Sequence, residues 1–367
     1  MKLTVLQEDL KKAVQQTSHF ISNKAQLPIL SNILLRATKT RLILSATNLE
    51  TSITTSIAAK VESEGEVAVN GKTFNDLISN LSSGSIEIEV FQEQLKIVSN
   101  KFKSNLLGTN TADFPVLPQE IAKDSIKFSS KDFVKALSRL LFSVSTDETR
   151  PILTGVLFIF NENELKLVST DGFRLTETKL KLNEKQKEFK IIIPKAILNE
   201  VSKIESETIE MSWDSKNNQV IFGFNDTILS SRVIEGEFPD YEKIIPQSSI
   251  CELVIDKEEF EKAIKIASVF ARESANSVKM QIVGQNLKVS AESSASGNQE
   301  TELEVKNESG MENEINIMFN FRFLEEYLKI VEADEFRMLI SDNNKASKFI
   351  DPKSPNLLHI IMPIKTT

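Results

Sequence analysis

The sequence predicts an α+β protein made of three copies of one domain of about 123 residues. One amphipathic helix pattern occurs three times, and its apolar anchors Leu10, Phe133 and Phe260 lie 123 and 127 residues apart. A second helix pattern follows in each copy at the same two offsets, and short alternating strands separate the helices. We therefore expect each copy to pack two helices on antiparallel sheets.

The first helix of each copy is expected around residues 9–14, 132–137 and 259–264. Each segment reads acidic residue, apolar residue, variable residue, lysine, alanine and aliphatic residue. The lysine therefore falls at the same place in every copy. Amphipathic helices of this kind pack their apolar face against the strands and leave the opposite face to solvent.

The second helix of each copy is expected where apolar residues recur at positions i, i+4 and i+7. The three sets are Phe74, Ile78 and Leu81; Ile197, Val201 and Ile204; and Leu324, Leu328 and Val331. Alternating strands are expected near these helices, at residues 85–90 in the first copy and 207–211 in the second.

Other landmarks keep the same spacing and divide the chain. The Pro-Ile-Leu motif at 28–30 reappears 123 residues later at 151–153, whereas the third copy lacks it. Proline and polar residues punctuate the chain near residues 120 and 248. We therefore expect domains at 1–120, 121–248 and 249–367.

The composition excludes several classes of chemistry. The chain has 44 Lys and Arg against 52 Asp and Glu, a formal charge of −8, and lacks any apolar run of ~18 residues, so we expect a cytoplasmic protein without membrane attachment. Cys251, His19 and His359 are too few for a disulfide or a zinc cluster. We interpret Cys251 as a small buried residue in preference to a reactive thiol. Gly71-Lys72-Thr73 looks like the end of a phosphate loop, but the residues before it alternate like a strand.

Many cations lie on or beside the predicted helices. One interpretation is a solvated helix face, which is ordinary. The other is that three like domains, arranged around an axis, project equivalent lysines in equivalent directions and form a basic wall within an acidic molecule. Repetition in register favours the second. The cations concerned are Lys11, Lys12, Lys72, Lys135, Arg139, Lys195, Lys203, Lys262, Lys265, Arg322 and Lys329.

Several motifs together resemble the bacterial DNA polymerase III beta-subunit family, the sliding clamps. They are the motif at 28–30, Thr-Asp-Gly-Phe-Arg-Leu at 170–175, Phe-Pro-Asp-Tyr at 238–241 and the ending at 359–363. The resemblance spans the whole chain. It implies three DNA-clamp domains per subunit, a ring of two subunits whose helices line the hole, and no catalytic site, metal or cofactor.

The same resemblance implies the partners. These are a second copy of the chain, double-stranded DNA contacted without sequence preference, the DNA polymerase III catalytic subunit, the clamp loader and other proteins that carry clamp-binding peptides. Scattered lysines without an aromatic stacking platform suit a ring that slides, because strong phosphate contacts would impede sliding.

A pocket for a short partner peptide rich in Gln, Leu and Phe is implied between the second and third domains. Its implied residues are Leu153, Thr170, Gly172, Phe173, Arg174, Leu175, Pro246, Ile360, Met362, Pro363 and Ile364. On local grounds, Asp171-Gly172 is equally consistent with a strand-end turn. Arg174 has a structural ion pair as its alternative role. The ending Lys365-Thr366-Thr367 departs from the family's commoner one.

Seven cations are expected to face DNA, with Lys24 assigned by the resemblance alone. They are Lys12, Lys24, Lys72, Lys135, Arg139, Lys195 and Lys262. At the implied dimer interface, Phe102 and Leu106 of one subunit meet Val269 and Phe270 of the other, with Arg272 and Glu273 nearby. A plain core position is the alternative for Val269 and Phe270.

Two other functions compete with the clamp. The first is a hydrolase that uses Asp147, Glu148 and Asp171, which a deep cleft with two carboxylates of raised pKa would support. The second is a three-domain protein-interaction scaffold that binds no DNA, which an open monomer with scattered lysines would support.

Overall fold

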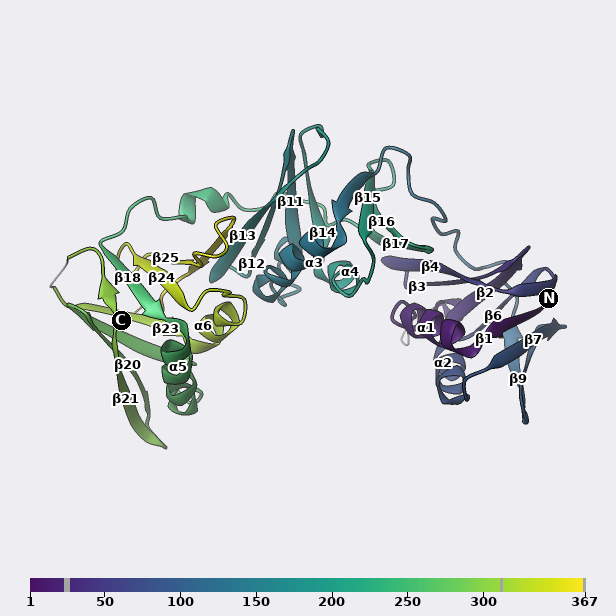
Figure 1. The fold of residues 1–367 in the computed structure, drawn as a ribbon, viewed down its shortest axis with the longest axis horizontal. Helices are drawn as coiled ribbons and strands as arrows, with labels where there is room; N and C mark the ends of the chain where they lie inside the picture. Colours follow the sequence, from purple (N-terminus) through teal and green to yellow (C-terminus); the bar gives the residue numbers. More distant parts are fainter. Residues whose placement is uncertain (23–26, 311–312, 366–367) are drawn as a thin grey trace. The chain divides into compact units, whose positions relative to one another are not determined.

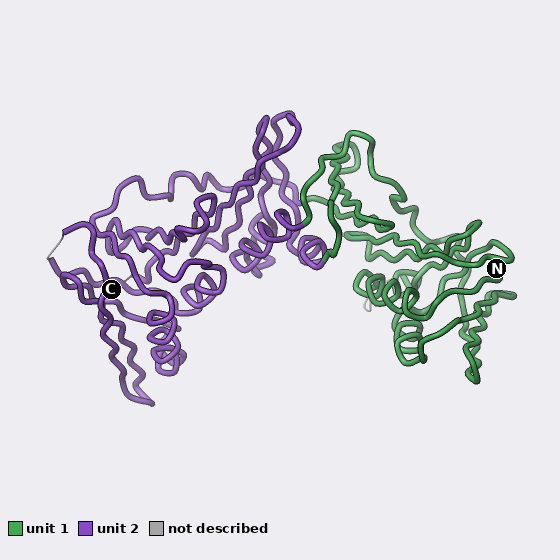
Figure 2. The backbone as a smooth tube through the Cα atoms, viewed as in Figure 1, with its two compact units in different colours: residues 1–130, 204–233 green, residues 131–203, 234–367 purple. Residues whose placement is uncertain are grey.

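The computed structural model describes residues 1–22, 27–310 and 313–365 (Figure 1). The chain divides into two compact units. Unit 1 holds residues 1–130 and 204–233, and unit 2 holds the rest (Figure 2). None of the helices in the described ranges combines the length and the apolar character that a membrane crossing requires.

Unit 1 is built on one antiparallel sheet. In hydrogen-bonded order its strands are β10 (Ile126–Ser129), β15 (Thr208–Asp214), β16 (Gln219–Phe224), β17 (Thr227–Arg232), β4 (Thr51–Ala58), β3 (Arg41–Thr47), β2 (Asn32–Thr38), β6 (Gly65–Asn70), β9 (Phe102–Thr109), β8 (Gln94–Ser99), β7 (Ser85–Phe91), β1 (Lys2–Leu6) and β5 (Lys60–Ser63). Strands of the first and second repeats thus form one continuous ladder that joins at β4 and β17.

The seam between β4 and β17 is buried and polar. The hydroxyl oxygens of Ser52 and Ser230 lie 2.6 Å apart, and those of Thr55 and Thr227 lie 2.7 Å apart. All four residues are buried. Because a buried hydroxyl costs free energy unless it is hydrogen-bonded, this reciprocal pairing lets polar side chains form the seam.

Helices α1 (Gln7–Ser18) and α2 (Gly71–Asn80) lie side by side against the strands of unit 1 (Figure 1). The Asn70 side chain caps α2 by accepting a hydrogen bond from the Thr73 backbone N–H at 3.0 Å. A Cβ on Gly71 would come within 3.0–3.1 Å of Ile21 and Ile33. The Gly71-Lys72-Thr73 segment is therefore a tightly packed helix start directly after β6, which is the strand expected before it.

Unit 2 contains two antiparallel sheets. The larger one consists, in hydrogen-bonded order, of β14 (Phe189–Pro194), β11 (Gly155–Asn161), β12 (Glu164–Thr170), β13 (Arg174–Lys181), β26 (Leu357–Ile361), β25 (Ser347–Ile350), β24 (Glu335–Ile340), β18 (Cys251–Asp256) and β22 (Lys306–Asn307). The smaller one consists of β21 (Gly297–Glu304), β20 (Asn286–Ser293), β19 (Ser277–Val283) and β23 (Ile315–Asn320). The pair β13–β26 joins the second repeat to the third.

The helices of unit 2 follow the repeat pattern. They are α3 (Ser130–Ser138, whose first residue belongs to unit 1), α4 (Lys195–Val201), α5 (Lys257–Ala271) and α6 (Phe321–Leu328). Helices α5 and α6 pack on each other, and Phe260 of α5 meets Phe336 with ring centroids 5.4 Å apart. Cys251 is buried beside this core, and burial raises the pKa of its thiol, so its interpretation as a small buried residue is confirmed.

The predicted helices are confirmed, but the second helix of each repeat is shorter than its apolar spacing indicates. Leu81, Ile204 and Val331 lie beyond the ends of α2, α4 and α6. Leu81 has extended backbone, and Val331 packs in the core after its helix has ended. The i+7 residue therefore continues the packing face without continuing the helix. The strands predicted at 85–90 and 207–211 are β7 and β15.

Candidate peptide-binding site

The turn between β12 and β13 is held by its own side chains. The Thr170 hydroxyl donates to the Arg174 carbonyl at 2.6 Å and accepts from the Gly172 N–H at 3.0 Å. One oxygen of Asp171 accepts the N–H groups of Phe173 and Arg174 at 2.9 and 3.0 Å. Gly172 has φ +92°, in the left-handed region that favours glycine. The turn leaves the Phe173 side chain 60% exposed.

The C-terminal segment lies directly beside this turn. Strand β26 pairs with β13, so that Leu175 faces Ile360 and Arg174 faces Ile361. After the strand, the Met362 N–H donates to the Phe173 carbonyl at 2.8 Å, and the Ile364 N–H donates to the Met318 carbonyl at 2.7 Å. Residues that are far apart in sequence, at 170–175 and 360–364, therefore form one surface within unit 2.

Apolar side chains gather behind this surface. Leu175 and Ile360 are buried in one cluster with Val168 and Tyr241, and Met362 packs against it, half-buried. Ile152 and Ile245 also pack against this cluster, and they directly precede the expected residues Leu153 and Pro246. Leu153 itself is buried, and its carbonyl accepts the Ser145 N–H at 3.0 Å. Pro363 is buried next to Met362.

Arg174 is committed to structural contacts. Its side chain is only 7% exposed. Nε lies 3.0 Å from the Asp171 carboxylate, Nη1 donates to Glu326 of α6, and Nη2 donates to the Phe142 carbonyl at 2.6 Å. The guanidinium also lies over the ring of Phe323, 4.4 Å from its centroid. The ion-pair alternative is therefore the role that the geometry supports, and Arg174 anchors the turn to the third repeat.

Arg150 is a site residue that sequence reasoning missed. Its guanidinium pairs with Asp147 at 3.1 Å and lies within 3.5 Å of the Asp171 carbonyl. A Cβ on Gly172 would stand 3.1 Å from Arg150 Nη1, so the glycine makes room for this arginine. The Arg150 side chain is 48% exposed and forms a basic rim at the edge of the 170–175 turn. The available signal was its place directly before the repeated Pro-Ile-Leu motif.

The acids proposed for hydrolysis do not form a catalytic set. Hydrogen bonds from Thr149, first of all from its hydroxyl, and from Arg150 lower the pKa of Asp147. The pKa is lowered likewise for seven other carboxylates: Glu66, Glu89, Asp214, Glu261, Glu273, Glu314 and Glu332. A general acid at neutral pH requires the opposite shift.

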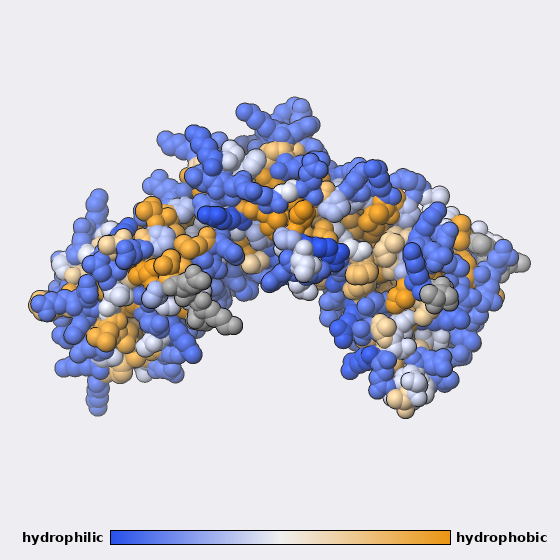
Figure 3. Space-filling view, turned by 180° about the vertical axis from the view of Figure 1, so that it is seen from behind, coloured by the Kyte–Doolittle hydropathy of each residue, from blue (hydrophilic) through white to orange (hydrophobic). Residues whose placement is uncertain are grey.

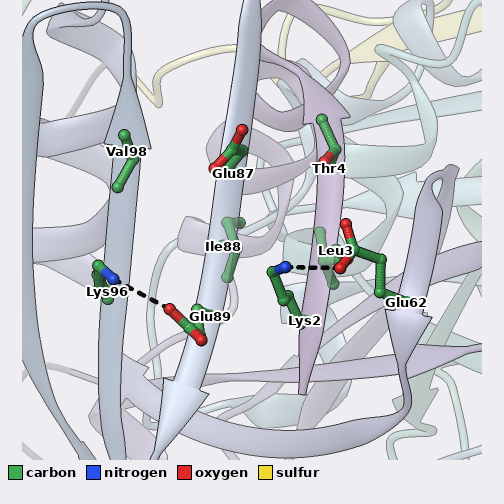
Figure 4. A pocket seen from close by; sticks show the side chains of 9 residues that line it. All are labelled: Lys2, Leu3, Thr4, Glu62, Glu87, Ile88, Glu89, Lys96 and Val98. Atoms are coloured by element: carbon green, nitrogen blue, oxygen red, sulfur yellow. Dashed lines mark hydrogen bonds and ion pairs between the residues drawn. The ribbon is translucent and has the colours of Figure 1, made fainter.

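A hollow in unit 1 also lacks catalytic character. It lies over strands β1, β5, β7 and β8, and two surface ion pairs occupy it (Figure 4). Lys2 contacts Glu62 at 2.6 Å, and Lys96 contacts Glu89 at 3.0 Å. All four side chains are about half exposed, so the hollow is a charged sheet surface. Among the described residues there is also no group of three or more His, Cys, Asp or Glu that could hold a metal ion.

The expected DNA-facing cations of the described ranges lie on or directly beside helices but differ in their partners. Arg139 directly follows α3, and the others are on helices: Lys12, Lys72, Lys135, Lys195 and Lys262. Lys12, Lys72, Lys135 and Lys262 are exposed, whereas Lys195 is half-buried. Burial, followed by the charge of Arg174, lowers the pKa of Lys195. The ion pairs are Lys135 and Arg139 with Glu332, and Lys262 with Glu258. Lys24 lies outside the described residues.

The residues expected at a dimer interface lie on strand β9 and on helix α5. Phe102 and Leu106 are half-buried on β9, which pairs with β8 over this stretch and meets β6 only through Gly108 and Thr109. Phe270 packs partly on the core around α5, as its alternative role predicted, whereas Val269 is 60% exposed. On the face drawn in Figure 3, hydrophobic side chains form separate patches within a mostly hydrophilic surface.

Comparison with known proteins places these features in one family. Sequence models described as the DNA polymerase III beta subunit match three successive stretches of the chain: the N-terminal domain at 1–118, the central domain at 127–240 and the C-terminal domain at 242–365. The chain is 30% identical to the beta sliding clamp of Rickettsia felis over 377 residues and 31% identical to that of Staphylococcus aureus over 379, with complete coverage of both proteins. It also resembles the crystal structure of the Bacillus subtilis DNA polymerase sliding clamp, at 27% identity and a TM-score of 0.94 over the full length of both chains.

Proposed function

Because the chain belongs to the DNA polymerase III beta-subunit family, the beta sliding clamps, we propose that two copies close into a ring around duplex DNA and tether replication and repair proteins. Sliding clamps are non-catalytic processivity factors. The observation that carries the proposal is the threefold repeat of cation-bearing helices across the whole length of a family member. We propose the domain limits 1–120, 121–248 and 249–367 for this arrangement.

A net charge of −8 is compatible with encircling DNA. A ring held by topology needs only weak and sequence-independent phosphate contacts, which lysines on helices supply. Acidic residues alternate along outward strand positions, as Glu87 and Glu89 do on β7. The whole-molecule sum therefore says little about the local charge beside DNA.

Two strand edges support the ring contact. The stretch of β9 from Phe102 to Leu107 has β8 on one side and no strand on the other among the described strands, and β21 is the last strand of its sheet. An unpaired strand edge is a ready template for another chain. Exposed Lys103 on β9 and exposed Glu300 and Glu302 on β21 have opposite charges. We infer that β9 of one subunit meets β21 of the other, with Val269 and Phe270 beside the contact.

The surface formed by 170–175 and 360–364 is the proposed docking site for partner peptides rich in Gln, Leu and Phe. Leu175, Ile360 and Met362 supply apolar contacts, and methionine adapts to differently shaped partners. Exposed Phe173 and the Arg150 rim frame the surface. The polymerase catalytic subunit and the clamp loader are its expected ligands.

Retention on DNA tests the ring. After loading, the protein is expected to persist on nicked circular DNA and to run off the same DNA once it has been linearised, because only a closed circle traps a ring. Gel filtration of the protein–DNA complexes, before and after linearisation, measures both populations. Equal loss from circular and linear DNA would contradict the proposal.

Substitution of Met362 tests the docking surface. The Met362→Ala variant is expected to bind a fluorescent partner peptide about tenfold more weakly, because a half-buried side chain at the centre of the surface is truncated. Titration by fluorescence anisotropy measures the affinity. The control is Leu49→Ala, which truncates an exposed apolar residue of the corresponding turn in the first repeat. Sedimentation must show intact dimers, and dissociation of the Met362 variant would show that the residue belongs to the ring contact instead.

A further inference from the structure

Two of the expected DNA-facing cations share one carboxylate. Glu332, which follows α6, lies 2.8 Å from Lys135 Nζ of α3 and 2.6 Å from Arg139 Nη2. The Lys135 and Glu332 side chains are 47% and 41% exposed, whereas Arg139 is 13% exposed. Hydrogen bonds from Lys135 and Arg139 lower the pKa of Glu332, so this carboxylate is ionised at neutral pH. An acidic residue of the third repeat thus neutralises basic residues of the second.

The backbone of Glu332 is fixed beside these cations. Its N–H donates to the buried carboxylate of Asp351 at 2.9 Å. The same carboxylate accepts the Ser354 hydroxyl at 2.9 Å, and that hydroxyl in turn accepts a hydrogen bond from Arg139 at 2.8 Å. The buried part of this network orients Arg139 and the backbone at 332. The exposed carboxylate of Glu332 is the part that solvent and ions can reach.

The other repeats show that this arrangement is not part of the repeated helix. Lys262, which is equivalent to Lys135, pairs with Glu258 four residues earlier on its own helix. Lys12, the third equivalent, forms no ion pair among the residues that the structure describes. Of these three equivalent lysines, only Lys135 has a carboxylate partner from a different domain among the described residues. That carboxylate also contacts a second cation, Arg139.

We propose that the Glu332 carboxylate competes with DNA phosphate for Lys135 and Arg139, and thereby weakens the hold of the ring on the duplex. Carboxylate and phosphate oxygens accept the same charge-assisted hydrogen bonds from lysine and arginine. An exposed ion pair contributes little net free energy, so a phosphate can replace this carboxylate at little cost. A phosphate can therefore contact Lys135 or Arg139 only after the ion pair with Glu332 has broken. The inference rests on the proposed function, because it presupposes that α3 faces DNA.

The test is Glu332→Gln, which keeps the shape of the side chain and removes its charge. The variant is expected to diffuse along DNA about three- to fivefold more slowly at low salt, because Lys135 gains a phosphate contact. The difference should shrink in high salt, where phosphate contacts weaken. Tracking of single labelled proteins on stretched DNA measures the diffusion coefficient. The control is Glu162→Gln, which makes the same charge change on the β11–β12 hairpin, where Glu162 forms an exposed ion pair with Lys185. This variant should diffuse like the wild type.

Further variants separate the possible outcomes. Lys135→Ala alone should change the diffusion coefficient little from that of the wild type. Added to Glu332→Gln, it should restore most of the wild-type diffusion coefficient. Equal diffusion of Glu332→Gln and wild type, or a lowered thermal midpoint alone, would overturn the inference and leave Glu332 as a contact between repeats. Failure of the wild type to remain on nicked circles would overturn the proposed function instead, so the two failures are distinguishable.

Discussion

Replacing Arg174 with alanine is expected to destabilise unit 2 by about 3–5 kcal/mol and to weaken peptide binding at least tenfold. The substitution strips Asp171 and the Phe142 carbonyl of a partner and removes a guanidinium that packs over Phe323. A partly buried carboxylate left without its cation costs more than the intact pair contributes. Peptide binding is expected to weaken because Arg174 holds the 170–175 turn against α6 through its hydrogen bond to Glu326.

Two variants make this prediction specific. Arg150→Ala removes a 48% exposed arginine beside the same turn and is expected to change stability by no more than about 1 kcal/mol. Arg174→Lys should recover little, because an ammonium cannot serve two carboxylates and a carbonyl in one plane. Urea unfolding and titration with a partner peptide measure the two effects. If Arg174→Ala kept both wild-type stability and wild-type affinity, Arg174 would not be an anchor.

Comparison of the repeats predicted the helices because each repeat forms its own amphipathic faces. The spacing of Leu10, Phe133 and Phe260 is a local signal, and all three are fully buried in the fold. The Asp171-Gly172 turn was one of two interpretations of that motif, because Asp and Gly favour a strand-end turn locally. Comparison of the repeats could not locate the end of the second helix, because Val331 keeps the apolar spacing after the backbone has left the helix.

Contacts between repeats had no local signal. Arg174 and Glu326 are 152 positions apart, and Lys135 and Glu332 are 197 apart. Ser52 and Thr55 carry polar hydroxyls, yet β17 of the next repeat covers them. A side chain that is polar within its own domain can therefore be a buried seam residue in the assembled chain. Arg150 was missed for a related reason, since its role depends on the space above Gly172.

His359 is another polar residue that is buried at a seam between repeats, and its burial predicts that the fold is sensitive to acid. Its side chain is fully buried on β26, and Nδ1 lies 2.9 Å from the Thr176 hydroxyl on β13. The ring stacks on Tyr327 with centroids 5.1 Å apart. Burial, followed by the charge of Arg174, lowers the pKa of His359 to about 3. The folded chain therefore keeps this histidine neutral.

The sign of the effect follows from proton linkage. An unfolded histidine has a pKa of about 6.5, so between about pH 6.5 and pH 3 the unfolded chain binds a proton that the folded chain does not. The stability that His359 contributes is fully present above about pH 6.5 and is lost as the pH falls toward 3. Each pH unit in this window costs about 1.4 kcal/mol, so acidification from pH 7 to 4.5 should cost about 3 kcal/mol through this residue.

His359→Gln is expected to lose about 3 kcal/mol less than the wild type over the same pH interval, although it starts from a lower stability at pH 7. The control is His19→Gln, which makes the same substitution at the other histidine of the chain, an exposed residue of unit 1. Urea unfolding of the full chain at pH 7 and 4.5 measures the difference for all three proteins. Protonation of carboxylates with lowered pKa values, such as Glu332 and Asp147, also lowers the stability of the fold in acid. This loss is equal in each protein and cancels in the comparison.

Identical acid losses in the wild type and His359→Gln would mean that the buried imidazole is protonated in the fold. The seam between β13 and β26 would then have to accommodate a second cation beside Arg174.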